Sequence, residues 1–209
     1  MSIIPKLATS LNRRDEVPNQ ELAKEIVRSE DTAAVSELVE NLKNKNKGIR
    51  YDCIKTLYEV GYQKPNLIAD HLPAFLALLE NKDNRLQWGA MTALGCIARE
   101  KPADVFDSLG RIVEAAEKGS VITRDHCVNI LISLSALDTY ADKTFPLLLE
   151  QLMGSPTNQL PMYAENALPI ITAGNKDRFI EVLAGRLDEI EKESKRKRVE
   201  KVIAKSGKI

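Results

Sequence analysis

Residues suited to acid–base or nucleophilic chemistry are scarce in this sequence of 209 residues. It has two histidines, His71 and His126, and three cysteines, Cys53, Cys96 and Cys127. His126 and Cys127 are adjacent, but consecutive residues of a helix point about 100° apart and do not form a nucleophile–base pair. There is no glycine-rich phosphate loop, no Gly-x-Ser-x-Gly turn and no His-Glu-x-x-His motif. We therefore predict that the protein is not an enzyme and has no catalytic residue, metal site or cofactor.

Aromatic and amide side chains could instead carry out recognition. The spacing of Tyr51, Tyr58 and Tyr62 places these rings on one face of a helix. Equivalent positions recur every 37 residues, and exposed aromatic, cationic and amide groups are typical anchors of protein or peptide sites. The alternative is that the aromatic rings pack against neighbouring helices or residues 1–15. The predicted partner-binding residues are Tyr51, Lys55, Tyr58, Tyr62, Trp88, Arg99, Asp125, Asn129 and Asn166.

The elements that position these residues are predicted to be helices in a repeat of 37 residues. Apolar positions recur at helical spacing with short polar breaks, and no alternation typical of strands is present. Three positions define the second helix of each unit. They are the small residues Cys53, Ala90, Cys127 and Ala164; then Leu57, Leu94, Leu131 and Leu168; then Val60, Ile97, Leu134 and Ile171. The preceding helices repeat in the same way, so each unit is a helical hairpin that must stack on its neighbours to bury its apolar stripe.

One unit, residues 71–97, resembles a complete HEAT repeat in its sequence HLPAFLALLENKDNRLQWGAMTALGCI. Pro73 stands where that family often has a kinking proline in its first helix, and Asp83 lies in the turn. The resemblance implies an all-α, right-handed superhelix of about five hairpins, whose second helices line the concave surface. The arginine position of the family holds Gln87 here, so its usual Asp–Arg ladder is incomplete.

We expect a single solenoid domain over residues 1–209. Residues 1–30 would form N-terminal capping helices, residues 31–173 four repeats, and residues 174–209 a C-terminal capping hairpin with a basic end. From Glu191 to Ile209 there are eight basic and three acidic residues. A shifted apolar stripe of Val199, Val202 and Ile203 favours a solvated capping helix over a nucleic-acid patch.

Charge and composition narrow the functional classes. Thirty basic residues balance thirty acidic ones, so no global field attracts a polyanion. We predict a non-catalytic scaffold that holds a protein or peptide on its concave face. The alternative is a nucleic-acid-binding protein, since some HEAT-like proteins are DNA-alkylation-repair glycosylases with aromatic residues and an Asp on a basic surface. Here Lys55 and Arg99 are the cations of the face, and neutralising several phosphates needs more than two.

The sequence also predicts where the protein is located in the cell. No apolar run approaches the roughly 18 residues of a membrane span. The first residues, MSIIPKLATSLNRR, lack the apolar stretch of a secretory signal, which predicts a cytoplasmic protein. The identity of the partner and the oligomeric state stay open at this point.

Overall fold

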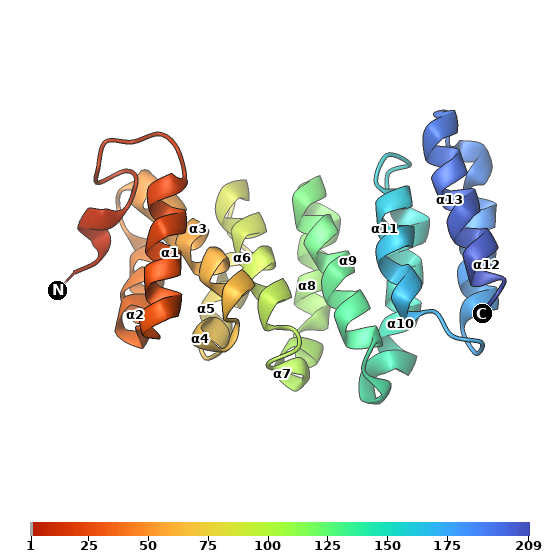
Figure 1. Ribbon diagram of the computed structural model, residues 1–209, viewed down its shortest axis with the longest axis horizontal. Coiled ribbons are helices and arrows are strands. Elements are labelled where there is room, and N and C mark those ends of the chain that lie inside the picture. The colour runs from red at the N-terminus through yellow and green to blue at the C-terminus, as the bar shows by residue number, and fades with distance from the viewer. Residues whose placement is uncertain (1) are drawn as a thin grey trace. The chain divides into compact units, whose positions relative to one another are not determined.

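Helices account for all the regular structure in the computed structural model, which describes residues 2–209 (Figure 1). Thirteen α-helices are joined by short turns and by four 3-10 helices. The α-helices are α1 (Val17–Ser29), α2 (Thr32–Glu40), α3 (Lys47–Gln63), α4 (Asn66–Ala69), α5 (Leu72–Leu78), α6 (Asn84–Ile97), α7 (Pro102–Asp107), α8 (Leu109–Lys118), α9 (Val121–Ser135), α10 (Asp138–Gly154), α11 (Leu160–Ala167), α12 (Lys176–Gly185) and α13 (Glu193–Ser206). The 3-10 helices are η1 (Ile4–Lys6), η2 (Asn41–Lys43), η3 (Leu168–Ile170) and η4 (Leu187–Glu189).

The contacts within the chain divide it into two compact units. The first ends at Cys127 and the second runs from Val128 to Ile209, so the division falls inside α9. Each unit is described by itself below, and the single domain expected over residues 1–209 stays a prediction. In the part of the chain that the structure describes, no helix is both long and apolar enough to cross a membrane.

The repeat positions form the core of the first unit. Cys53, Leu57 and Val60 of α3 are fully buried, and so are the equivalent residues of α6, Ala90, Leu94 and Ile97. Helix α3 packs against α1 on one side and α6 on the other, while α5 packs against α6. The predicted hairpin register is therefore confirmed for these helices.

Two glycines permit the close approach of α3 and its neighbours. A Cβ atom on Gly89 of α6 would lie 2.6 Å from Cγ1 of Ile54, and one on Gly61 of α3 would lie 2.6 Å from Cδ1 of Ile68 and 3.0 Å from Cβ of Cys96. Real Cβ atoms do not approach other atoms this closely. The absence of a side chain at these two positions sets the spacing of α3 and α6.

Prolines occur in first helices of the hairpins, two of them in the first turn of a short helix and one inside a continuous helix. Pro73 lies in the first turn of α5, after the short helix α4, and Pro102 lies in the first turn of α7. A proline lacks the backbone N–H that helix continuation needs, but the first turn does not use that donor. Pro146 lies inside α10.

The second unit keeps the register with one difference. Leu131, Leu134 and Ala164 are fully buried, but Leu168 is half-buried. It lies in η3 and not in α11, which ends at Ala167. Pro169 cannot donate the next helical hydrogen bond, and the chain leaves the helix here.

Both terminal helices bury apolar residues, and α13 buries two of the three residues of its expected stripe. In α1, Leu22 and Ile26 are buried and the helix packs against α3. In α13, Val199 and Val202 are buried, and the helix packs against α11 and α12. The role of these helices as caps stays a prediction.

Candidate binding surface

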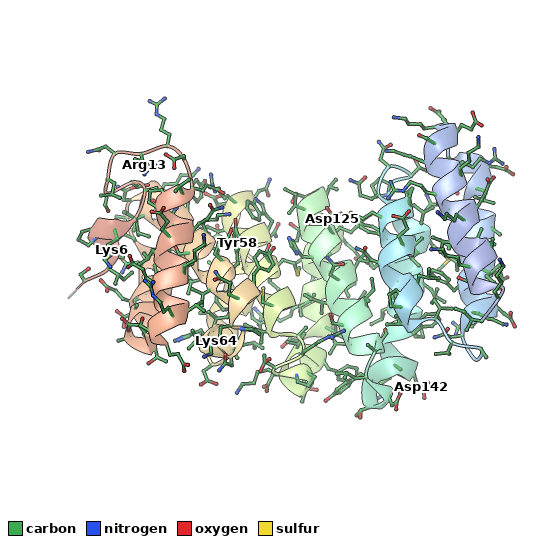
Figure 2. All side chains as sticks on the ribbon, in the orientation of Figure 1. Lys6, Arg13, Tyr58, Lys64, Asp125 and Asp142 are labelled. Carbon is green, nitrogen blue, oxygen red and sulfur yellow. The ribbon has the colours of Figure 1, made fainter. Side chains whose placement is uncertain are left out.

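Three aromatic rings meet where α3 and α6 pack together, and we call them the aromatic cluster: Tyr58, Tyr62 and Trp88. The centroid of the Tyr58 ring lies 5.8 Å from that of Tyr62 in an edge-on arrangement. It lies 5.9 Å from the centroid of Trp88. Tyr58 is 6% exposed and Tyr62 is 59% exposed, whereas Trp88 is half-buried. The helical spacing of the tyrosines and the 37-residue step thus bring three of the expected residues together around Tyr58, which is labelled in Figure 2.

The cluster differs from the expected patch because Tyr58 is buried. It was expected to be accessible, but its ring is enclosed by the other two rings and by Lys55, whose Nζ atom lies 4.8 Å from the Tyr58 centroid. Burial raises the pKa of Tyr58, and burial also raises the pKa of Tyr62 to about 12. Both hydroxyls therefore keep their protons at neutral pH.

Tyr51 lies apart from the cluster, although its position is equivalent to that of Trp88. Its hydroxyl donates to the carboxylate of Asp83 at 2.8 and 3.0 Å. Its ring lies 5.3 Å from Nζ of Lys47 and 4.8 Å from Cζ of Arg85. Tyr51 thus bonds to Asp83, the N-cap residue of α6. The ring that lies against Trp88 is that of Tyr58.

Lys55 is a buried structural cation, which corrects the expectation of an accessible charge. It is 7% exposed, and its Nζ atom lies 2.7 Å from Oε1 of Glu59 and 2.9 Å from Oε2 of Glu16. Burial lowers the pKa of Lys55, but the hydrogen bonds that its ammonium group donates to Glu59 and Glu16 outweigh this effect and raise the pKa overall. Glu16 also accepts from Nη2 of Arg85 at 3.0 Å. The residue just before α1 therefore neutralises two cations of this surface.

Sequence spacing missed how the N-terminal segment is attached to α3. The buried carboxylate of Asp52 accepts from the backbone N–H of Thr9 at 2.7 Å and from Nδ2 of Asn19 at 2.8 Å. Asn19 in turn accepts from the backbone N–H of Ala8 at 3.0 Å. No sequence signal marks this carboxylate, because Asp52 lies among other charged residues of α3, such as Arg50 and Lys55. Together with Glu16, Asp52 and Asn19 hold segment 2–16 against α3.

The remaining expected residues are divided between the two units. In the first, Arg99 follows the end of α6 and is exposed, and Asp125 of α9 is half-buried. In the second, Asn166 of α11 donates through Nδ2 to Oδ1 of Asn129 of α9 at 3.3 Å, and both side chains are exposed. The structure therefore brings the two predicted asparagines together.

Burial shifts the pKa values of the three cysteines and of the half-buried His126 towards the uncharged form. Burial raises the pKa of each thiol, Cys53, Cys96 and Cys127, to about 12. Burial lowers the pKa of His126. A thiol with so high a pKa stays protonated, and the thiolate is the nucleophilic form. Among residues 2–209, no group of three or more His, Cys, Asp or Glu side chains could hold a metal ion.

Comparisons with known proteins show the fold. No protein-family model and no curated protein matches the sequence. Among solved structures, an engineered protein is similar at 17% identity with a TM-score of 0.66, over 100% of this chain and 98% of its own. A computationally designed armadillo repeat protein for modular peptide recognition is 15% identical, with a TM-score of 0.67 over 90% of this chain and 92% of its own. A designed armadillo repeat protein in complex with a (KR)4 peptide is 15% identical, with a TM-score of 0.67 over 98% of this chain and 100% of its own.

The chain has an armadillo/HEAT-like repeat fold. The fold class inferred from the 37-residue repeat is thereby confirmed. At 15–17% identity the likeness concerns the fold alone, because one fold can host many functions. For this armadillo/HEAT-like chain, function has to be argued from its own side chains.

Proposed function

We propose that the protein is a non-catalytic scaffold that binds a protein or peptide segment on the face formed by the second helices of its hairpins. The observation that carries the proposal is the aromatic cluster. Tyr62 presents 59% of its surface to solvent while its ring packs edge-on against the buried Tyr58. A ring that is already held in place loses little conformational entropy on binding, which favours recognition by exposed tyrosines.

Two further features support a peptide as the partner. The paired amides of Asn129 and Asn166 have both donors and acceptors, which match those of a peptide backbone. Two of the similar solved structures are described as made for peptide recognition or as bound to a peptide, and this supports the same use here by analogy. A cytoplasmic location belongs to the proposal, because three free cysteines fit a reducing compartment.

A nucleic-acid role is disfavoured for the aromatic face. Its two expected cations were Lys55 and Arg99, and Lys55 is neutralised by Glu16 and Glu59. Binding to a phosphate backbone depends on the number of phosphates that are neutralised, and of the two expected cations only Arg99 is exposed. A short protein segment can bind without the neutralisation of several phosphates.

The test is affinity capture from extract of the source organism with the wild-type chain, Tyr62→Ala and Met153→Ala. Met153 is a matched control, because it is 51% exposed and lies on α10, outside the proposed face. We expect all three chains to melt within a few degrees of one another, since exposed substitutions change stability by about 0.5 kcal/mol or less. Tyr62→Ala should lose partners that wild type and Met153→Ala retain. A stable Tyr62→Ala chain that captures the same partners would place recognition elsewhere.

A further inference from the structure

The basic residues of the C-terminal segment fall into two groups. Four are held by pairs within the second unit: Lys195 with Asn158, Arg196 with Asp188, Lys197 with Glu193, and Arg198 with Glu165. The others, Lys192, Lys201, Lys205 and Lys208, are exposed and have no ion pair among the residues that the structure describes. Half of the basic residues are therefore paired within the chain, and the charges of the other half are available to a partner.

The repeat register explains why these lysines face solvent. Lys201 and Lys205 stand at the positions that are equivalent, after four repeat steps, to the buried Cys53 and Leu57. In α13 the buried positions are Val199 and Val202 instead. The helix is thus rotated relative to the earlier second helices. Positions that belong to the core in earlier repeats are therefore occupied by lysines in α13. These lysines form a charged stripe at spacing i, i+4.

This stripe adjoins the exposed face of α11. Arg198 bonds to Glu165 through Nε at 2.9 Å and through Nη2 at 2.5 Å, and α11 packs against α13 (Figure 1). The hydrogen bond from Arg198 lowers the pKa of Glu165, and the charges of Lys201 and Lys205 lower it further. Both ammonium groups therefore act on the patch that contains Glu165. Three cations surround one carboxylate there, so the patch carries a net positive charge.

The amide pair extends the same patch. Asn166 follows Glu165 on the exposed face of α11, and its Nδ2 bonds to Oδ1 of Asn129. The second N–H of Asn166 and the whole amino group of Asn129 are left to donate. We call this combined surface the basic amide face: Asn129, Glu165, Asn166, Arg198, Lys201 and Lys205.

We propose that the basic amide face binds an extended acidic peptide segment. The asparagine amides would pair with the backbone, and Lys201 and Lys205 would pair with its carboxylates. The inference rests on the proposed function in that both use the second helices of the hairpins, but it concerns the second unit and fixes the charge of the partner. An acidic peptide fits better than a nucleic acid, because binding to a nucleic acid depends on the number of phosphates neutralised and two free lysines neutralise few of them.

The experiment measures fluorescence anisotropy of defined probes with the full chain. The probes are a labelled Glu–Ser peptide of about eight residues, a matching Lys–Ser peptide, and single-stranded oligothymidine. Glu alternates with Ser because side chains alternate along an extended strand. The test variant is Lys201→Gln with Lys205→Gln. The matched control is Lys24→Gln with Lys43→Gln, which changes the net charge equally at exposed lysines of the first unit.

We expect the Glu–Ser peptide to bind, and the Lys–Ser peptide not to bind. The test variant should lose about fivefold in affinity, as two exposed ion pairs would contribute, while the control stays near wild type. Replacement of both lysines by arginine should preserve binding. Glu165→Gln should tighten it, because that change frees Arg198. Raising NaCl from about 50 to about 300 mM should weaken binding in wild type more than in the test variant.

Three results would overturn the inference. Equal losses in the test and control variants would show that overall charge, and not this face, attracts the peptide. Tighter binding of oligothymidine than of the Glu–Ser peptide, lost in the test variant, would identify a nucleic-acid surface. No binding of the Glu–Ser peptide would rule out an acidic partner. The affinity capture with Tyr62→Ala tests the first unit and the anisotropy experiment tests the second, so failure of the aromatic-cluster proposal stays distinguishable from failure of this one.

Discussion

The packing of α3 on α6 depends on the absence of a side chain at Gly89, and Gly89→Ala tests this directly. The added Cβ would lie 2.6 Å from Cγ1 of Ile54 and 3.3 Å from its Cγ2. Carbon atoms in contact prefer a separation of about 3.5–4.0 Å. Ile54 is buried and β-branched, so it has little freedom to move aside.

The magnitude follows from two opposing effects. Overpacking a dense core costs about 1–3 kcal/mol. Replacing a helical Gly by Ala returns about 0.5–1 kcal/mol through the unfolded chain and helix propensity. We therefore expect Gly89→Ala to lower the free energy of unfolding by about 0–2.5 kcal/mol. Gly110→Ala is the matched control, because no atom lies within 4 Å of its added Cβ, and it should be neutral or stabilising.

A double-mutant cycle separates the clash from other effects. Ile54→Ala removes the atoms that the new Cβ would meet, at its own cost of about 2–5 kcal/mol. In that background Gly89→Ala should stabilise by about 0.5–1 kcal/mol, so the sign of its effect reverses. Urea unfolding followed by fluorescence of Trp88, the single tryptophan, reports on the adjacent position. The account of α3–α6 spacing is refuted if Gly89→Ala stabilises the wild-type background as much as Gly110→Ala does.

Three further predictions concern the core, the thiols and the N-terminal segment. Leu94→Ala should cost about 2–5 kcal/mol in urea unfolding, and a loss below about 0.5 kcal/mol would contradict the repeat register. The three thiols should resist a thiol reagent at pH 8 until the chain unfolds. Stability should fall as pH rises from about 9 towards 12, because unfolded thiols ionise near 9.0 while folded ones hold their protons to about 12. Glu16→Gln should lower the free energy of unfolding by about 1 kcal/mol, because Lys55 is left with a single carboxylate partner. An unchanged free energy would show that Glu59 alone compensates the charge of Lys55.

The sequence determined the repeat fold, because its signal is local and periodic. Apolar residues at steps of 3 and 4 specify a helical face within each segment, whatever the rest of the chain does. A small residue followed by Leu four positions later, at Cys53 and again at Ala90, then ties successive helices into one register. Each hairpin is left with an apolar stripe that stacking alone can bury, and the fold follows.

The sequence also determined which aromatic residues share a face, but not which of them meet solvent. Lys55 and Tyr62 lie on the same predicted face of α3, yet Lys55 is 7% exposed and Tyr62 is 59% exposed. Lys55 is paired with Glu59 of its own helix and with Glu16, which is distant in sequence. Helical spacing gives the direction of a side chain within its own helix and carries no information about the segment that covers it.

Only the tertiary structure decided which basic residues of the C-terminal segment are paired. In the sequence they form one run, and three of their four partners, Asn158, Glu165 and Asp188, lie before the segment that starts at Glu191. Which lysines are neutralised depends on how α13 is rotated against α11 and α12, and burial of Val199 and Val202 sets that rotation. Ion pairing requires contact within a few ångströms, so it is decided by packing and not by position along the chain.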